Sequence, residues 1–139
     1  MSERTASPAA GFADLTALVR AARSLVVFTG AGISTESGIP DYRSPGGQWT
    51  QTSPPTLGEF RSGPAGQRRY WDYYREFFPV FLKARPNPGH LALGRLWAAG
   101  RLRGVVTQNI DGLHQAGGVD ANAVWELHGN AFMSACLDC

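Results

Sequence analysis

The sequence predicts an α/β protein built on a parallel β-sheet, and three features support this prediction. Two short runs rich in apolar and β-branched residues, 25–29 (LVVFT) and 102–107 (LRGVVT), are typical of strands in a parallel sheet. Residues 124–127 form a third strand candidate. Small or polar residues follow each of these segments, and α/β sheets bind ligands at the carboxyl ends of their strands.

Length and composition limit the classes of protein to be considered. The chain has 139 residues, 43% of them hydrophobic, which suffices for one domain with a core. Its formal net charge of +2 is too small to argue for a nucleic acid or an anionic membrane as partner. No apolar run approaches the roughly 18 residues that span a bilayer. The first ten residues lack the apolar region of a secretory signal. We therefore expect a cytoplasmic protein without direct nucleic-acid or membrane partners.

The first predicted strand leads directly into a glycine-rich loop. Gly30, Ala31 and Gly32 have minimal side chains, so backbone N–H groups there can approach a phosphate closely. The spacing departs from G-x-G-x-x-G because Thr35 occupies the third expected position, and no acidic residue follows about 20 positions on. A glycine-rich turn without a ligand is therefore an alternative. Against it, the long loop that follows is costly in a compact domain unless it covers something.

Helical segments are expected around the strands. We expect residues 1–10 to be disordered, and a helix at 11–23 whose apolar side packs on the sheet. Further helices are predicted at 57–60, at 67–78 with Pro79 closing or kinking the helix, and between the N-cap Asn87 and the stop signal Gly100.

Aromatic residues recur along the helix predicted at 67–78. They share one wide helical face and comprise Tyr70, Trp71, Tyr74, Phe77 and Phe78. Such a stripe usually forms core or packing between lobes. The alternative is a wall of the substrate cleft, and both interpretations stay open.

Polar side chains cluster just after the second strand. Gln108, Asn109 and Asp111 carry the amide and carboxylate groups that fix ribose hydroxyls and a carboxamide. Asn109 or Asp111 is alternatively the N-cap of a short helix that ends at 117–118, and the two roles are compatible. His114 belongs to this helix and is expected to be structural, as is His90.

His128 follows the third strand candidate and is the preferred catalytic residue. An imidazole titrates near neutrality, so it can accept a proton from a hydroxyl group. A lone histidine is more often a polar residue with its hydrogen bonds satisfied, and the spacing by itself does not exclude this.

The chain ends in a C-x-x-C motif formed by Cys136 and Cys139. Two thiolates suit half of a tetrahedral zinc site, which needs four ligands. A redox pair and two idle thiols are the alternatives, although the βαβ context of a thioredoxin-like motif is lacking.

Four sequence blocks together resemble the sirtuins, the NAD-dependent protein lysine deacylases. They are GAGISTESGIPDYRSPGG from residue 30, TQNIDGLH from 107, ELHG from 126 and CLDC from 136, in the order of that family. The resemblance implies a partial Rossmann-like parallel sheet with a small helical lobe and the first half of a zinc module. It places a cofactor-binding loop at 25–50, the lobe at 53–100, the Rossmann strands at 102–129 and the zinc half-module at 130–139, within an incomplete catalytic domain at 11–139.

The resemblance also implies the residues of the site. His128 matches the general base of the family, and Cys136 and Cys139 match two of four zinc ligands. The matching NAD-binding residues are Gly30, Ala31, Gly32, Ile33, Ser34, Glu36, Gly38, Ile39, Pro40, Asp41, Tyr42, Arg43, Gln108, Asn109, Ile110 and Asp111.

The activity implied is transfer of an acyl group from a protein lysine to ADP-ribose with release of nicotinamide. The acyl oxygen attacks the anomeric carbon as nicotinamide leaves, and His128 deprotonates a ribose hydroxyl. The PDYRSPG stretch resembles the lipoamidase and ADP-ribosyltransferase class of the family. No Tyr-x-x-Arg pair is placed as in the desuccinylases, which argues against a preference for succinyl groups.

The chain departs from the family pattern because a second cysteine pair and the later NAD-binding segments do not follow. We expect a truncated fragment, a gene-model error or a genuine short product, and the activity described is that of the parent protein. A non-catalytic NAD or ADP-ribose-binding module and an ADP-ribosyltransferase are alternative functions. A hydride-transferring dehydrogenase is disfavoured by the irregular glycine fingerprint.

Overall fold

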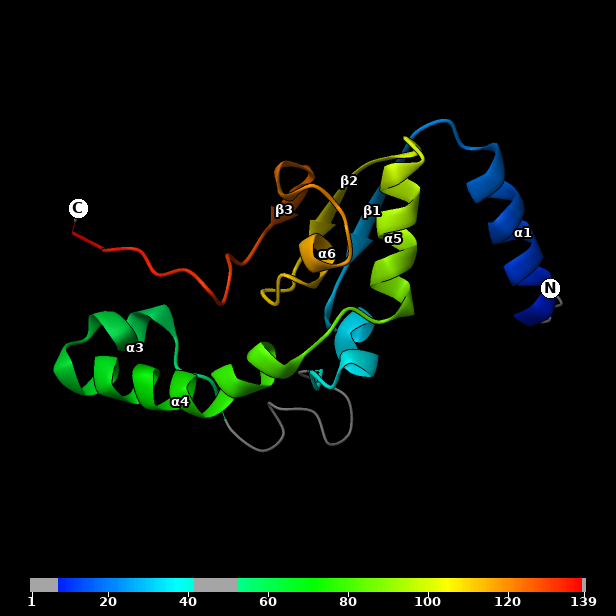
Figure 1. The fold of residues 1–139 in the computed structure, drawn as a ribbon. Coiled ribbons are helices and arrows are strands. Elements are labelled where there is room, and N and C mark those ends of the chain that lie inside the picture. The colour runs from blue at the N-terminus through cyan, green and yellow to red at the C-terminus, as the bar shows by residue number, and fades with distance from the viewer. Residues whose placement is uncertain (1–7, 42–52, 139) are drawn as a thin grey trace, which may run out of the picture.

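Three parallel strands form the centre of the structure, a computed structural model that describes residues 8–41 and 53–138 (Figure 1). The strands are β1 (Leu25–Thr29), β2 (Leu102–Thr107) and β3 (Val124–Glu126), in the spatial order β1-β2-β3. Phe28 pairs with Val106, which in turn pairs with Trp125. The predicted α/β class and all three strand positions are confirmed, with the third strand ending one residue early.

The two faces of this sheet differ in how they are covered. Helix α5 (Pro88–Ala98) covers one face, where its Leu93 packs with Leu102 and Val105 in a buried cluster. On the other face the side chains of Val26 and Phe28 are 66% and 62% exposed. The prediction that 25–29 is a buried strand is therefore only half right, because among the described residues a packed helix layer lies on one face of β1.

Helix α5 begins and ends where the sequence predicts. Asn87 is the N-cap, and its Oδ1 accepts a hydrogen bond from the backbone N–H of Gly89 at 2.9 Å. Pro88 occupies the first helical position, where a missing N–H carries no cost. The helix ends just before Gly100, which adopts a left-handed backbone (φ +67°).

A separate helical lobe consists of α3 (Leu57–Arg61) and α4 (Pro64–Lys83), as Figure 1 shows. The turn predicted at 57–60 is confirmed as α3. The sequence predicts that Pro79 closes or kinks the helix. Pro79 lies inside α4, so it does not close the helix, and a kink stays a prediction. A proline removes one backbone hydrogen bond, and Val80 and Phe81 beyond it pack against the buried cluster of Ile39, Ala84 and Leu113. This packing stabilises the final turn of α4.

Helix α1 (Pro8–Ala21) stands apart from the sheet (Figure 1). It begins before the predicted residue 11, so residues 8–10 are helical, and residues 1–7 lie outside the described part. Phe12 and Leu18 are 72% and 69% exposed, so the prediction that this helix packs on the sheet is wrong. The contact that joins its end to the sheet is polar: the Arg101 guanidinium donates to the carbonyl oxygens of Val19 and Ala22 at 2.8 and 3.0 Å.

Short elements complete the sheet connections. A 3₁₀ helix, η1 (Ala31–Ser37), follows β1, while α6 (Leu113–Ala116) and a second 3₁₀ turn, η2 (Ala121–Ala123), lie between β2 and β3. The N-cap position of α6 is Gly112, not Asn109 or Asp111 as predicted. Asp111 nevertheless satisfies the first turn, because its Oδ1 accepts from the Leu113 N–H at 2.9 Å. Among the described residues, no helix has the length and apolar character needed to cross a membrane.

Candidate functional site

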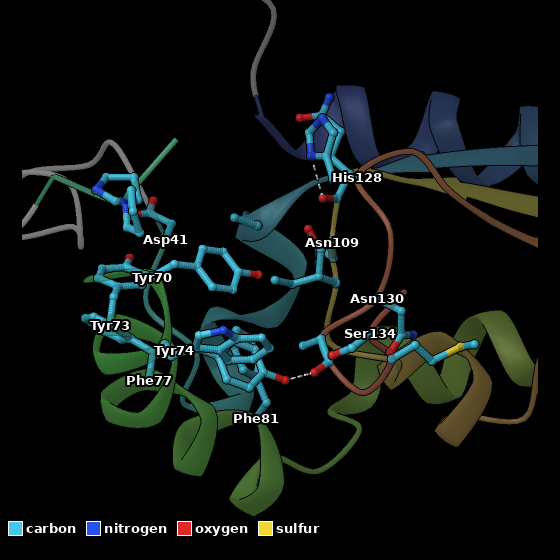
Figure 2. Close-up of a pocket in the computed structure, with 18 of the residues that line it drawn as sticks. Asp41, Tyr70, Tyr73, Tyr74, Phe77, Phe81, Asn109, His128, Asn130 and Ser134 are labelled. Carbon is cyan, nitrogen blue, oxygen red and sulfur yellow. Dashed lines mark hydrogen bonds between the residues drawn. The ribbon is translucent and has the colours of Figure 1, made fainter. Parts of the chain in front are cut away.

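A cavity of about 570 Å³ opens at the carboxyl ends of the three strands (Figure 2). Ala31, Gln108 and His128 come within two residues of the ends of β1, β2 and β3, and all three line it. The other lining residues are Gly32, Asp41, Pro54, Pro55, Tyr70, Trp71, Tyr73, Tyr74, Phe77, Phe81, Asn109, Ile110, Asn130, Ala131, Met133 and Ser134. Its volume lies in the range of small-molecule and cofactor sites, about 300–1,000 Å³.

His128 is exposed and is held by a hydrogen bond from its ring. The Nδ1 atom lies 2.9 Å from the backbone carbonyl oxygen of Gln108. A carbonyl oxygen only accepts hydrogen bonds, so the neutral ring carries its proton on Nδ1 and keeps a lone pair on Nε2. An imidazole in this tautomer is ready to accept a proton at Nε2.

The turn that carries His128 is closed on both sides. Gly129 has a left-handed backbone (φ +77°), and its N–H donates to the carbonyl oxygen of Glu126 at 3.2 Å. The Glu126 Oε1 atom accepts from Asn130 Nδ2 at 2.7 Å and from Gln115 Nε2 at 2.9 Å. These bonds tie the turn to α6 and restrict the positions that His128 can adopt.

The glycine loop presents bare backbone at the cavity. A Cβ atom added to Gly30 or Gly32 would meet no heavy atom within 4 Å, so the space beside the backbone is open. Gly38 ends η1 with φ +83°, a backbone conformation that favours glycine. This glycine therefore turns the chain towards Asp41, which lines the cavity.

Behind the loop, Ser34 connects the two segments that were predicted to bind a cofactor. Its hydroxyl donates to Asp111 Oδ2 at 2.6 Å and accepts from Asn109 Nδ2 at 3.0 Å. Ser34 is 1% exposed, Asp111 5% and Asn109 6%. The hydrogen bond to the Asp111 carboxylate is charged, and such bonds are stronger than neutral ones when water is excluded. Together, the two hydrogen bonds of Ser34 fix the distance between the glycine loop and the segment after β2.

The structure divides the sequence-predicted cofactor residues into groups. Those that line the cavity are Ala31, Gly32, Asp41, Gln108, Asn109 and Ile110. Ser34 and Asp111 are buried beneath it. Ile33 packs against the buried cluster that includes Leu93 and Val105. Its N–H donates to the Gly30 carbonyl oxygen at 3.1 Å, so this amide is already used within the loop. Ile39 belongs to the second buried cluster.

The remaining predicted residues lie away from the cavity or outside the description. Glu36 and Pro40 are exposed and do not line it. Gly30 and Gly38 bracket η1 and shape the loop. Tyr42 and Arg43 lie outside the described residues. The cofactor contacts of all these residues stay predictions.

An aromatic wall faces His128 across the cavity, as Figure 2 shows. Tyr70, Tyr73, Tyr74, Phe77 and Phe81 all come from α4 and line the cavity, and no described residue of α4 is buried. The cleft-wall interpretation of the aromatic stripe is therefore the better one. Tyr73, Phe81, Asn130, Met133 and Ser134 also line the cavity and were not predicted from the sequence. The aromatic periodicity signals the first two, while the last three depend on how the chain folds back after β3.

The Tyr74 hydroxyl connects the helical lobe to the segment after His128. It donates a hydrogen bond to the carbonyl oxygen of Ala131, and the rings of Phe78 and Phe132 meet edge to face with centroids 5.7 Å apart. Burial, with a smaller contribution from Tyr70, raises the pKa of Tyr74, so this hydroxyl keeps its proton near neutral pH. The helical lobe is thus joined to the segment that follows His128, beside the cavity.

Two histidines are buried beside the site, as the sequence predicts for structural residues. His90 and His114 are 0% and 1% exposed. Burial lowers the pKa of His90, an effect that the Asp111 carboxylate opposes. Burial, and then the neighbouring His90, lower the pKa of His114 to about 4. Both rings are therefore neutral at physiological pH.

The predicted zinc half-site is only partly described. Cys136 is exposed, and Cys139 lies outside the described residues. Within residues 8–41 and 53–138, no three His, Cys, Asp or Glu side chains lie together in a way that would hold a metal ion. Since structural zinc takes four ligands, the described residues do not form a complete zinc site.

Comparison with known proteins places this arrangement in a family. The model of the Sir2 family matches residues 30–139. The NAD-dependent protein deacetylase of Rhodopseudomonas palustris is 44% identical over 133 residues, covering 96% of this chain and 53% of that protein. NAD-dependent protein deacetylase 1 of Streptomyces coelicolor is 45% identical over 131 residues, covering 93% of this chain and 43% of that protein.

Solved structures agree with this placement. A structure described as Sir2 with a p53 peptide and NAD+ superposes with a TM-score of 0.75 at 38% identity, covering 91% of this chain and 49% of that one. A mutant Sir2 homologue in complex with ADP ribose gives a TM-score of 0.75 at 32% identity, covering 84% of this chain and 46% of that one.

The fold and the cavity define an α/β protein with a cavity at the carboxyl ends of its parallel strands. The chain belongs to the Sir2 family. It spans about half the length of the curated relatives that it matches.

Proposed function

We propose that this chain carries the NAD-binding and proton-transfer part of an NAD-dependent protein lysine deacylase. The observation that carries the proposal is the placement of His128, with Nε2 available for a proton, on the same cavity as the bare glycine loop and the aromatic wall of α4. Relatives named NAD-dependent protein deacetylase at about 44% identity support it.

The residues present suit a dinucleotide. The open space beside Gly30 and Gly32 would admit a pyrophosphate against the backbone. The amide groups of Gln108 and Asn109, with the Asp41 carboxylate, line the same cavity and would bind the nicotinamide end and its sugar hydroxyls. NAD, when bound, supplies a sugar carbon that accepts the acyl oxygen as nicotinamide leaves.

The chain's own residues would then act in three ways. His128 accepts a proton from a sugar hydroxyl at Nε2, while Gln108 holds the ring through Nδ1. The aromatic side chains of α4 exclude water and bind the apolar stem of an acylated lysine. Ser34, Asn109 and Asp111 keep the two cofactor segments at a constant distance.

The variant His128→Ala tests this proposal. We expect steady-state transfer of the acetyl group from an acetyl-lysine peptide to ADP-ribose to fall by about 10²–10⁴-fold, because this is the usual contribution of general base catalysis. NAD affinity, measured by calorimetry, should stay close to that of the unmodified chain. Leu127→Ala is the matched control, since Leu127 is an exposed neighbour that does not line the cavity.

The outcomes separate the candidate functions. Unchanged turnover in His128→Ala contradicts the assignment of the general base. NAD or ADP-ribose binding without nicotinamide release by the unmodified chain favours the non-catalytic binding module over the deacylase. Acyl-independent transfer of ADP-ribose to a protein favours the ADP-ribosyltransferase alternative.

Several finer assignments belong to the same proposal. The PDYRSPG stretch suggests the lipoamidase and ADP-ribosyltransferase class, and Cys136 with Cys139 would supply two of four zinc ligands. The division into a cofactor loop at 25–50, a helical lobe at 53–100, Rossmann strands at 102–129 and a zinc half-module at 130–139 of an incomplete domain stays a prediction. So do a cytoplasmic location and the lack of nucleic-acid and membrane partners.

A further inference from the structure

Two buried imidazole rings meet beneath the glycine loop. His90 on α5 and His114 on α6 have ring centroids 5.1 Å apart, and the planes of the rings are inclined by 54°. The Nε2 atom of His90 and the Nδ1 atom of His114 are both buried without a hydrogen-bond partner among the described residues. A buried polar atom left unpaired costs about 1–3 kcal/mol, so a neighbouring pair of such atoms calls for an explanation.

The partner of His90 determines which of its nitrogens carries the proton. The backbone N–H of Asn87 donates to His90 Nδ1 at 3.3 Å. The Nδ1 atom therefore acts as an acceptor, and in the neutral ring the proton resides on Nε2. The unpaired Nε2 atom of His90 is consequently a hydrogen-bond donor.

The unpaired atom of His114, in contrast, is a hydrogen-bond acceptor. The Thr29 hydroxyl donates to Thr107 Oγ1 at 2.8 Å, so the Thr29 oxygen is left to accept from His114 Nε2, also at 2.8 Å. His114 thus carries its proton on Nε2, and its unpaired Nδ1 atom is an acceptor. One ring offers a donor and the other an acceptor, so the two atoms can satisfy each other directly or through one water molecule.

This pair lies in the middle of a polar chain between the two predicted cofactor segments. On one side, Asn87 Nδ2 donates to the carbonyl oxygen of Ile33 at 2.6 Å and to Ser37 Oγ at 3.0 Å, both in the glycine loop. On the other side, Thr107 Oγ1 accepts from the backbone N–H of Asn109 at 3.0 Å. The chain of hydrogen bonds is continuous except at the gap between the two rings.

We propose that His90 and His114 are positioning residues, a neutral pair in complementary hydrogen-bonding roles that couples the glycine loop to the segment after β2. The proposal rests on the proposed function, because it assigns to the pair the task of keeping the two halves of the dinucleotide site in register. Neither ring lines the cavity, so the pair acts through Asn87 and Thr107.

The pair requires both rings to be neutral. A second proton on His90 would face the Asn87 N–H, and a second proton on His114 would turn both unpaired ring atoms into donors. The titratable groups that act on the two rings are each other and the Asp111 carboxylate on the segment after β2. The Asp111 carboxylate accepts hydrogen bonds from the Ser34 hydroxyl and the Leu113 N–H, so its oxygens are used by these two groups and not by either ring.

The tautomers are tested on the chain without a ligand. Nitrogen-15 NMR of the imidazole groups separates the two neutral tautomers from the cation. We expect both His90 and His114 to be neutral and protonated on Nε2 at pH 7. A proton on Nδ1 in either ring, or a charged ring, would overturn the proposal whatever the chain binds.

Two substitutions interrupt the pair and keep its outer hydrogen bonds. In His90→Asn the side-chain oxygen still accepts from Asn87, and in His114→Gln the amide still donates to Thr29. We expect each variant to bind ADP-ribose about tenfold more weakly by calorimetry. The double variant should bind ADP-ribose with about the same affinity as the single variant that binds it less tightly, because both substitutions remove the same contact.

A matched control separates this coupling from general loss of stability. Leu93→Ala lies on the same helix and is also buried, but it takes no part in the polar chain. It should lower stability to denaturant and leave ADP-ribose affinity unchanged. If folded His90→Asn and His114→Gln also bind ADP-ribose as tightly as the unmodified chain, the coupling does not exist. If the unmodified chain itself binds no ADP-ribose, the proposed function fails, and the tautomers still decide whether the pair forms.

Discussion

The Nδ1 atom of His128 lies 2.9 Å from the backbone carbonyl oxygen of Gln108. His128, two residues after the end of β3, is thus oriented by Gln108, the residue that follows β2. Because the acceptor belongs to the backbone, substitution of Gln108 leaves it in place. The position of His128 is therefore best tested through its own turn, where Gly129 supplies a left-handed backbone (φ +77°).

Gly129→Ala should reduce turnover, whereas its loss of stability should be no larger than that of the same substitution at another glycine with a left-handed backbone. A left-handed backbone costs a residue with a Cβ atom about 1–2 kcal/mol, and relief of that strain would move His128. Gly100→Ala is a matched control, since Gly100 also has a positive φ (+67°), meets nothing within 4 Å and lies far from the turn. We expect both variants to lose the same amount of stability in denaturant, and only Gly129→Ala to lose steady-state acyl transfer from an acetyl-lysine peptide. Equal turnover in the two variants would show that the turn does not orient His128.

Gly32→Ala and Gly94→Ala should separate ligand binding from folding. A Cβ atom on Gly32 meets no protein atom within 4 Å, so stability should be kept while the added methyl group occupies space beside the loop backbone and weakens NAD binding. A Cβ atom on Gly94 would lie 2.0 Å from the carbonyl oxygen of Gly117, where α5 and α6 meet. The resulting overpacking should cost roughly 1–3 kcal/mol of stability. Calorimetry measures NAD binding by both variants, and chemical denaturation measures their stability. If Gly32→Ala binds NAD as tightly as the unmodified chain, the pyrophosphate does not lie against the backbone of Gly32.

Ser34→Ala should destabilise the fold as well as the binding site. The substitution leaves Asp111 Oδ2 and Asn109 Nδ2 without their buried partner, and the expected cost is about 1–3 kcal/mol. Thr35→Ala is the control, because the Thr35 side chain is exposed and its hydrogen bond to the Gly32 carbonyl oxygen is local. Denaturation of the two variants in urea checks the difference. A cost below about 0.5 kcal/mol for Ser34→Ala, which is usual for surface changes, would contradict the role given to this network.

Stability should decrease as pH falls from neutrality towards 4. The pKa of His114 is about 4 in the folded chain, against an ordinary value of 6.5. Between these values the unfolded chain binds a proton that the folded chain does not, so the contribution is complete above pH 6.5 and is lost progressively down to pH 4. The loss from His114 amounts to roughly 3 kcal/mol at most, and His90, whose pKa is also lowered, adds to it. Urea unfolding at a series of pH values measures this slope, which should become smaller in His114→Gln. A slope unchanged by that substitution would show that His114 is not the responsible group.

Much of the local structure follows from short patterns in the sequence. The β2 strand begins and ends at the predicted residues, and Asn87 and Pro88 begin α5 as expected, because capping and proline effects act within a few residues. The polar residues after β2 and the histidine after β3 were also found in this way. Parallel strands bring their carboxyl ends to one edge of a sheet, so these residues meet at one cavity.

Other features depend on contacts between distant segments. Pro79 lies inside α4 because residues beyond it pack against Ile39 and Leu113, which local sequence does not reveal. The apolar side of α1 is exposed, and periodicity shows that a helix has such a side without showing what covers it. The sequence left open whether the aromatic residues of α4 form core or line a cleft, and this was decided by the position of α4 relative to the sheet.

By itself, the sequence determined the order of strands and helices, the bare glycine loop, and the histidine and amides after the strands, because each depends on neighbours along the chain. Only the tertiary structure decided that α4 faces His128, that Ser34 joins Asp111, and that His90 and His114 meet with a donor opposite an acceptor. These relationships join residues 24 to 77 positions apart, and they arise from how the helices pack on and beside the sheet.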